Sequence, residues 1–248
     1  MRSEIRKFTS VRSFWVYVTL LFVLLVLPIT LLSLLPADNR DASWEMSISG
    51  GPFFMVLAIV FMAAAIGGEI ETRMYAHAFL TQNNRSLWLI ARILVGLTTL
   101  AIIFTVGVAF ILLILVALGM NLDLTNTAPL YTQIGLCILF PIFSACIAAM
   151  TGSKMLTSTI VIIWSFMLNQ VLEFAATSSD KLIFLWLASP GTRMEQLGLQ
   201  LSSVYTGGGE GWGVSYLQPL GFNLLVIVVW LVVFIAGAFV VNARRDVR

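Results

Sequence analysis

Hydrophobic residues along this chain gather in six long runs that polar segments separate. The runs cover residues 14–35, 52–68, 93–118, 130–151, 155–176 and 220–242. Most of them reach the ~20 apolar residues that a helix needs to cross the hydrocarbon core of a bilayer. The second run is the shortest, and the third is long enough to tilt. The pattern predicts an all-α membrane protein with six transmembrane helices.

The placement of lysine and arginine predicts the orientation of these spans. Eleven of the 14 basic residues lie in the two termini or in segments on the same side as the termini. The other three, Arg40, Lys181 and Arg193, lie in segments on the opposite side. Because basic residues next to spans are retained in the cytoplasm, we expect both termini to be cytoplasmic. The long segment 177–219 is then extracellular.

The composition agrees with a single membrane domain. Hydrophobic residues make up 59% of the 248 residues and charged residues only 10%, whereas a soluble domain carries roughly 25% charged residues. We therefore predict one transmembrane domain over residues 1–248. Residues 1–13 precede the first span, residues 14–176 hold spans one to five, and residues 220–248 hold span six and a cytoplasmic tail.

No catalytic pattern stands out. The chain has no GxxxxGK[ST] phosphate-binding loop, no HExxH and no GxSxG. Two cysteines in one apolar run and a single histidine cannot form a Cys/His metal cluster. We expect no catalytic residue, no metal site and no cofactor bound by this chain, and no nucleic-acid partner.

The segment between the second and third spans is the largest predicted cytoplasmic feature. Glu69 and Arg73 are four residues apart, and so are Tyr75 and Phe79, so a helix would continue out of the second span with paired side chains. Leu80 extends the apolar ridge. One interpretation is a solvated helical elbow, and the other is a docking element for a cytosolic partner.

The chain resembles the permease subunits of ABC-2 type ABC exporters. In that family an acidic residue at the end of span two opens a cytoplasmic helix, and a basic residue starts span three. The interval from Glu69 to Arg92 matches the family's, with Phe79-Leu80 at the paired apolar positions. The family's Gly-Thr pair is replaced by Arg73-Met74. The basic opening Ser3-Glu4-Ile5-Arg6-Lys7 and the tail Ala243-Arg244-Arg245 are also similar.

The resemblance implies a function and a set of partners. Residues 69–85 would be the coupling helix that fits a groove on a separate ABC ATPase, and residues 3–12 an amphipathic interfacial helix. Two ATPase copies, which carry the ATP and Mg, and a second permease would complete the exporter, so this chain would not be an enzyme by itself. The docking residues implied are Glu69, Glu71, Arg73, Tyr75, Phe79, Leu80 and Arg85.

Span five carries polar residues at helical spacing. On a helical wheel Ser158, Ser165, Asn169 and Glu173 fall on one face. Polar groups are costly within a bilayer, so this face is either a wall of the translocation path or subunit interface, or a set of hydrogen bonds that fixes helix packing.

Two functions of different classes follow from these features. The first is the transmembrane subunit of an exporter for an amphipathic small molecule, peptide or lipid, in the cell membrane of a bacterium. The second is a membrane scaffold or immunity-type protein that binds a partner and transports nothing. An intramembrane enzyme has little support, because no polar set at span depth supplies a nucleophile and a base.

Overall fold

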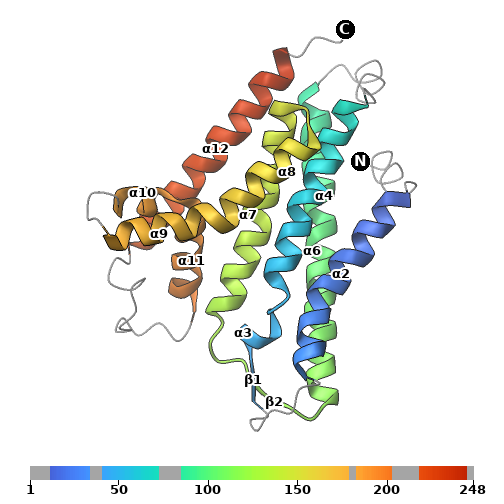
Figure 1. Ribbon diagram of the computed structural model, residues 1–248, viewed down its shortest axis with the longest axis vertical. Coiled ribbons are helices and arrows are strands. Elements are labelled where there is room, and N and C mark those ends of the chain that lie inside the picture. The colour runs from blue at the N-terminus through green and yellow to red at the C-terminus, as the bar shows by residue number, and fades with distance from the viewer. Residues whose placement is uncertain (1–11, 34–40, 73–84, 179–182, 203–217, 245–248) are drawn as a thin grey trace.

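The computed structural model describes residues 12–33, 41–72, 85–178, 183–202 and 218–244, which form a bundle of long helices (Figure 1). Six of its helices are long and apolar enough to cross a membrane, which confirms the predicted number of spans. This architecture supports a multi-pass membrane protein. The side on which the termini lie stays a prediction. The spans are α2 (Arg12–Ser33), α4 (Gly51–Glu71), α6 (Arg85–Ala117), α7 (Ala128–Thr151), the fifth span described below, and α12 (Leu220–Arg244).

The fifth span is built from three successive segments. These are α8 (Lys154–Ile163), the π-helical turn η1 (Trp164–Leu168) and α9 (Asn169–Ser178). The ring of Trp164 stacks on Phe143 of α7, with 5.3 Å between the centroids, and meets Trp230 of α12 edge-on. A π turn inserts an extra residue into the helix. The uninterrupted α-helical wheel assumed from the sequence therefore does not apply across this turn.

Helices α4 and α7 form the centre of the bundle, and small residues bring them together. Ala63 and Ala148 are wholly buried, and the Ser144 hydroxyl donates a hydrogen bond of 2.7 Å to the Ile59 carbonyl oxygen. Small side chains permit such close contact between membrane helices. The Cys137 and Cys146 thiols are free and buried on α7, so both cysteines are packing residues.

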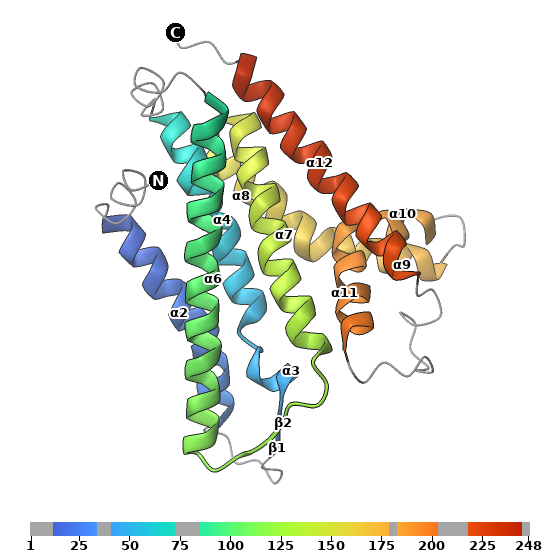
Figure 2. The same ribbon diagram turned by 180° about the vertical axis from the view of Figure 1, so that it is seen from behind.

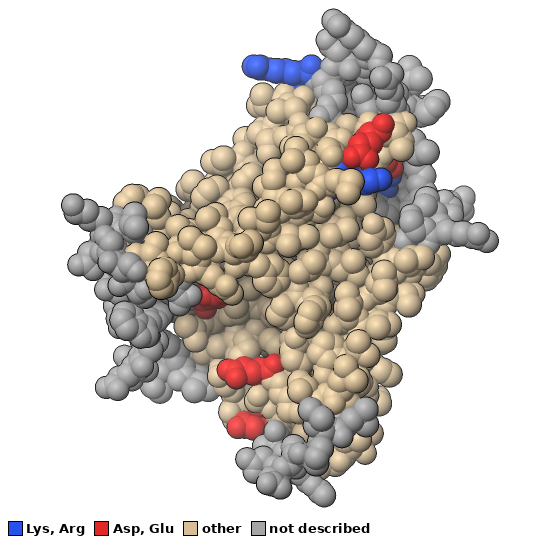
Figure 3. Space-filling model, viewed as in Figure 1, with Lys and Arg blue, Asp and Glu red and all other residues tan. Residues whose placement is uncertain are grey.

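The outer helices keep apolar faces that nothing in the described chain covers. Many large side chains of α2, α6 and α12 are exposed, and Figure 2 shows α12 along the edge of the bundle. In Figure 3, acidic and basic side chains lie near the upper end, acidic side chains lie toward the lower end, and a broad uncharged surface separates them. Such a surface suits hydrocarbon rather than water.

Two loops of the lower end pair as short strands, which hydrophobic periodicity did not predict. Strand β1 (Asp41–Ser43) runs parallel to β2 (Asn121–Asp123), with Ala42 opposite Leu122. The short helix α3 (Trp44–Ser47) follows β1, and the Trp44 indole N–H donates to the Leu124 carbonyl at 3.2 Å. The described residues are thus mostly helical, and one pair of short strands joins two of their loops.

Two short helices precede span six in the described residues. They are α10 (Ile183–Ala188) and α11 (Pro190–Leu201), and Pro190 begins the second of them. Proline suits the first turn of a helix because its missing N–H is unpaired there in any case. Helix α11 packs against α7 and α12, and a Cβ added to Gly198 would collide with Thr132. Helix α11 is therefore a packed part of the fold.

Candidate functional site

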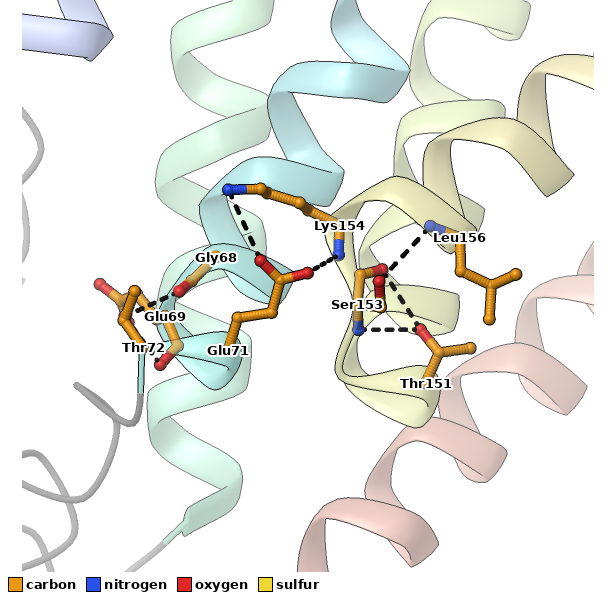
Figure 4. A network of polar contacts seen from close by, with 8 residues as sticks. All are labelled: Gly68, Glu69, Glu71, Thr72, Thr151, Ser153, Lys154 and Leu156. Carbon is orange, nitrogen blue, oxygen red and sulfur yellow. Dashed lines mark hydrogen bonds and ion pairs between the residues drawn. The ribbon is translucent and has the colours of Figure 1, made fainter.

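Two ion pairs join the end of α4 to its neighbours, one to α6 and one to the α7–α8 turn. We call Glu69, Glu71, Arg92 and Lys154 the charged junction. Its members on α4 and α6 lie on either side of segment 73–84 in the chain, and Figure 4 shows its α4 and α8 side. The α4 helix reaches it because its last turn, Gly68–Glu71, continues past the apolar run without a break.

The Glu69 carboxylate forms an ion pair with the Arg92 guanidinium through Oε1 and Nη2. Both side chains are largely shielded, with 21% of Glu69 and 6% of Arg92 exposed. The pair ties the end of α4 to the second turn of α6. Helix α6 begins at Arg85, eight residues before the apolar run that starts at residue 93, so Arg92 lies within the helix.

Glu71 joins the same end of α4 to the α7–α8 turn. The Lys154 backbone N–H donates to Glu71 Oε1 at 3.0 Å, and Lys154 Nζ lies 3.5 Å from Oε2. Glu71 thereby supplies an acceptor to one of the unpaired N–H groups in the first turn of α8. The Ser153 hydroxyl accepts from a second, that of Leu156, and Gly152 turns the chain at φ 71°.

Gly67 allows α4 to approach this turn closely. A Cβ placed on Gly67 would lie 2.8 Å from the Lys154 backbone nitrogen and 3.0 Å from its Cα. A Cβ on the next residue, Gly68, would meet nothing within 4 Å. The contact between α4 and the α7–α8 turn thus depends on one residue without a side chain.

We expect Lys154→Met to change the free energy of unfolding by less than about 1 kcal/mol, because exposed ion pairs contribute little. Half of the Lys154 side chain and a third of Glu71 are exposed. Glu71→Leu should lower the stability more than Lys154→Met does, since the Lys154 N–H also loses its acceptor. Unfolding of the two variants in detergent by denaturant measures this difference. Equal losses would contradict the importance of the backbone bond.

Of the predicted docking residues, the structure brings Glu69 and Glu71 into the charged junction. Arg85 is the first residue of α6, and its side chain is not described. The predicted residues Arg73, Tyr75, Phe79 and Leu80 lie outside the described part of the chain, and so does the expected interfacial helix up to residue 11. The coupling-helix assignment for residues 69–85 therefore stays a prediction.

The polar residues of span five are only partly described. The Ser158 and Ser165 hydroxyls donate to carbonyl oxygens of their own helix, those of Met155 and Ile162, at 3.0 Å each. Ser165 lies in the π turn, and Asn169 begins α9. The side chains of Asn169 and Glu173 lie outside the described part. The common polar face predicted from the wheel therefore stays a prediction, and the π turn changes the rotation between its two ends.

Sequence reasoning missed Arg92, Ser153 and Lys154 as parts of this site. It used Arg92 as the basic residue that starts span three in the family resemblance, and Lys154 only as a basic residue that orients the spans. Two signals were available: Arg92 follows the apolar residues Leu87–Ile90, and Ser153 precedes a helix as capping residues do. Neither signal names the partner on α4.

The arrangement of the charged junction suits mechanical linkage more than chemistry. It joins three helices by ion pairs and a backbone hydrogen bond, and it contains no nucleophile paired with a base. Within the described residues, no three His, Cys, Asp or Glu side chains are grouped to hold a metal ion. Comparison of the chain with protein-family models, with curated proteins and with solved structures finds no match.

Proposed function

We propose that this chain is the transmembrane subunit of an ATP-driven exporter of the ABC-2 type, and that segment 73–84 docks its ATPase. The observation that carries the proposal is the Glu69–Arg92 ion pair, which joins α4 and α6, the two helices on either side of that segment in the chain. Glu71 fastens the same place to the α7–α8 turn. A force applied to the segment would therefore reach α4, α6 and α8 together.

Transport requires that the ATPase bind two conformations of the permease with different affinity, since a partner shifts an equilibrium only by such a difference. Two ATPase copies, with ATP and Mg bound to them, would bring two permeases together. Each docked segment would then act on its own charged junction. The helices α4 and α8 would move as a unit, because Gly67 lies against the Lys154 backbone.

The exposed apolar faces of the fifth span and α12 offer a surface on which a second permease would pack. The fifth span and α12 are the least buried of the six candidate spans. The apolar face of α12 includes exposed side chains along its whole length, from Leu224 to Val240. Part of this surface would meet the second permease and the rest would meet lipid. An amphipathic small molecule, peptide or lipid would pass between the two permeases of a bacterial cell membrane.

The docking assignment is tested by co-expressing the tagged chain with the soluble ATPase encoded beside its gene. We expect the chain alone to hydrolyse no ATP and the pair to purify as a complex. Phe79→Ala with Leu80→Ala should reduce the co-purified ATPase about tenfold, as loss of central interface side chains does. The matched control is Leu113→Ala with Val116→Ala, two exposed residues at the end of α6 away from the segment, which should leave the yield unchanged.

Glu69 is not substituted alone in the docking test, because reversing its charge would break the ion pair with Arg92 and change the stability of the chain as well as docking. The exchange Glu69→Arg with Arg92→Glu keeps an ion pair at this place and separates docking from stability. Unchanged complex yield and transport in the Phe79/Leu80 variant would refute the docking assignment. Failure of any ATPase to bind the wild-type chain would refute the exporter and leave a partner-binding scaffold.

A further inference from the structure

A second polar cluster joins α11 to α12, two helices that lie apart from the upper ends of α4 and α8 (Figure 2). We call Arg193, Gln196, Gln200 and Asn223 the arginine cluster. The Asn223 amide donates to Gln200 Oε1 at 3.1 Å and to the Gln218 carbonyl at 3.2 Å. The cluster holds the packed helix α11 to the first turn of α12. It lies on the side that the basic residues predict to be extracellular.

Arg193 is wholly buried at the centre of this cluster. Its Nη1 group donates to Gln196 Oε1 and to Asn223 Oδ1, at 2.8 Å each. The Phe222 ring lies over the guanidinium, 5.8 Å from its carbon to the ring centroid. Its Nε and Nη2 atoms are buried and have no hydrogen-bond partner in the described part of the chain.

The two unpartnered atoms have a specific geometry. The Nε–H and Nη2–H bonds of a guanidinium project in parallel from one edge, and this edge binds two oxygens of a phosphate or carboxylate at once. The neutral partners on Nη1 hold the group in place without using that edge. The Nε–H and Nη2–H groups of Arg193 are therefore positioned to bind two oxygens of one anion.

The charge of Arg193 is also uncompensated by its hydrogen-bond partners. Burial lowers the pKa of the guanidinium to about 10, so it remains protonated at neutral pH. Gln196 and Asn223 are uncharged, and no ion pair of Arg193 occurs among the described residues. A buried charge without a counter-ion is destabilising. Such a residue is therefore a candidate binding site for an anion.

The surroundings of the cluster favour a lipid as the source of that anion. Asn223 is the fourth residue of the span α12, so Arg193 lies near the end of a span, at the depth of lipid headgroups. The first two turns of α12 expose the apolar side chains Leu220, Phe222, Leu224 and Leu225. A phospholipid could place its acyl chains along this surface and its phosphate beside the guanidinium.

We propose that the Nε–Nη2 edge of Arg193 binds the phosphate of an acidic phospholipid at the end of α12. Phe222 is 42% exposed, and its ring covers one face of the guanidinium. Because the Nε and Nη2 atoms are buried, binding requires a neighbouring side chain to move. The bound phosphate would act as the counter-ion of Arg193 and join α11 to the bilayer. The inference does not depend on the proposed transport.

The experiment measures lipid binding to the purified full-length chain in detergent by native mass spectrometry and by thermal stability. The probes are phosphatidylglycerol, phosphatidylcholine and inorganic phosphate. For the wild type we expect one phosphatidylglycerol to bind at least about tenfold more tightly than phosphatidylcholine, as expected for a charge-assisted bidentate contact. Arg193→Gln should abolish the preference, and Arg193→Lys should retain only part of it, because an ammonium offers no fork.

Two further variants separate binding from folding. Asn223→Asp places a carboxylate where the amide now accepts from Nη1, so it should neutralise Arg193 internally, raise the thermal stability of the lipid-free chain and weaken phosphatidylglycerol binding about tenfold. Arg244→Gln removes an exposed arginine at the other end of α12 and should leave the preference unchanged.

Several results of these binding and stability measurements would overturn the proposal. If wild type binds both phospholipids equally, or if Asn223→Asp stabilises the chain without weakening phosphatidylglycerol binding, Arg193 has only a structural role. If Arg244→Gln lowers binding as much as Arg193→Gln, the preference reflects general charge. If inorganic phosphate alone stabilises the chain as much as the lipid does, the fork is a phosphate site and the lipid assignment is wrong.

Discussion

Arg92→Met is expected to lower the free energy of unfolding by about 2–4 kcal/mol, because it leaves the Glu69 carboxylate without its partner in a largely shielded place. The methionine fills most of the space of the arginine stem, so little of the loss comes from packing. We place the value below that of a fully buried pair because a fifth of the Glu69 side chain is exposed. Reversible denaturation of the purified chain in mixed micelles measures it.

The double variant Glu69→Gln with Arg92→Met separates the pair from its isolated charge. Removing both charges should restore more than half of the stability lost in Arg92→Met, because no unpaired carboxylate remains. Lys154→Met is the comparison at an exposed pair. If Arg92→Met loses no more stability than Lys154→Met, or if the double variant loses the sum of its two single changes, the ion pair does not hold α4 to α6.

Gly67→Val should be the most damaging single change at the α4–α8 contact. Its Cβ alone would come within 2.8 Å of the Lys154 backbone nitrogen. Backbone atoms cannot rotate away as the end of a long side chain can, so α8 must shift. That shift would break the hydrogen bond from the Lys154 N–H to Glu71. Overpacking of this kind costs about 1–3 kcal/mol, and we expect a value near the upper end.

The neighbouring residue supplies the control. Gly68→Val adds the same side chain one position later, where a Cβ meets nothing within 4 Å, and it should change stability by less than about 0.5 kcal/mol. Denaturation of both variants and a disulfide formed between cysteines placed on α4 and α8 would report stability and distance. Equal behaviour of the two variants would show that α4 does not contact the turn at Gly67.

The membrane architecture could be predicted from local pattern because the requirement is local. A helix crosses a bilayer if its own residues are apolar over about 20 positions, and the six runs meet this test without reference to any other segment. The start of α11 at Pro190 and the tight turn at Gly152 are also local features that a sequence can indicate, since proline and glycine act through their own backbone.

The candidate site was harder to predict from the sequence, because the residues that pair in it are far apart along the chain. The acidic residues Glu69 and Glu71 were identified from their position after an apolar run, but their partners Arg92 and Lys154 belong to other helices. Span five departs from a continuous α-helix for a related reason: its π turn is packed against Trp230 and Phe143, and helical periodicity alone cannot show where a turn gains a residue.

The apolar runs alone predict six helices and place Glu69 and Glu71 at the end of the second, with no metal or catalytic motif beside them. The Glu69–Arg92 pair, the contact of Gly67 with Lys154, and the burial of Arg193 with its Nε and Nη2 atoms unpaired follow from how the helices pack. Hydrophobicity specifies which residues leave water, whereas the pairing of charges depends on which helices become neighbours, and that is a property of the packed bundle.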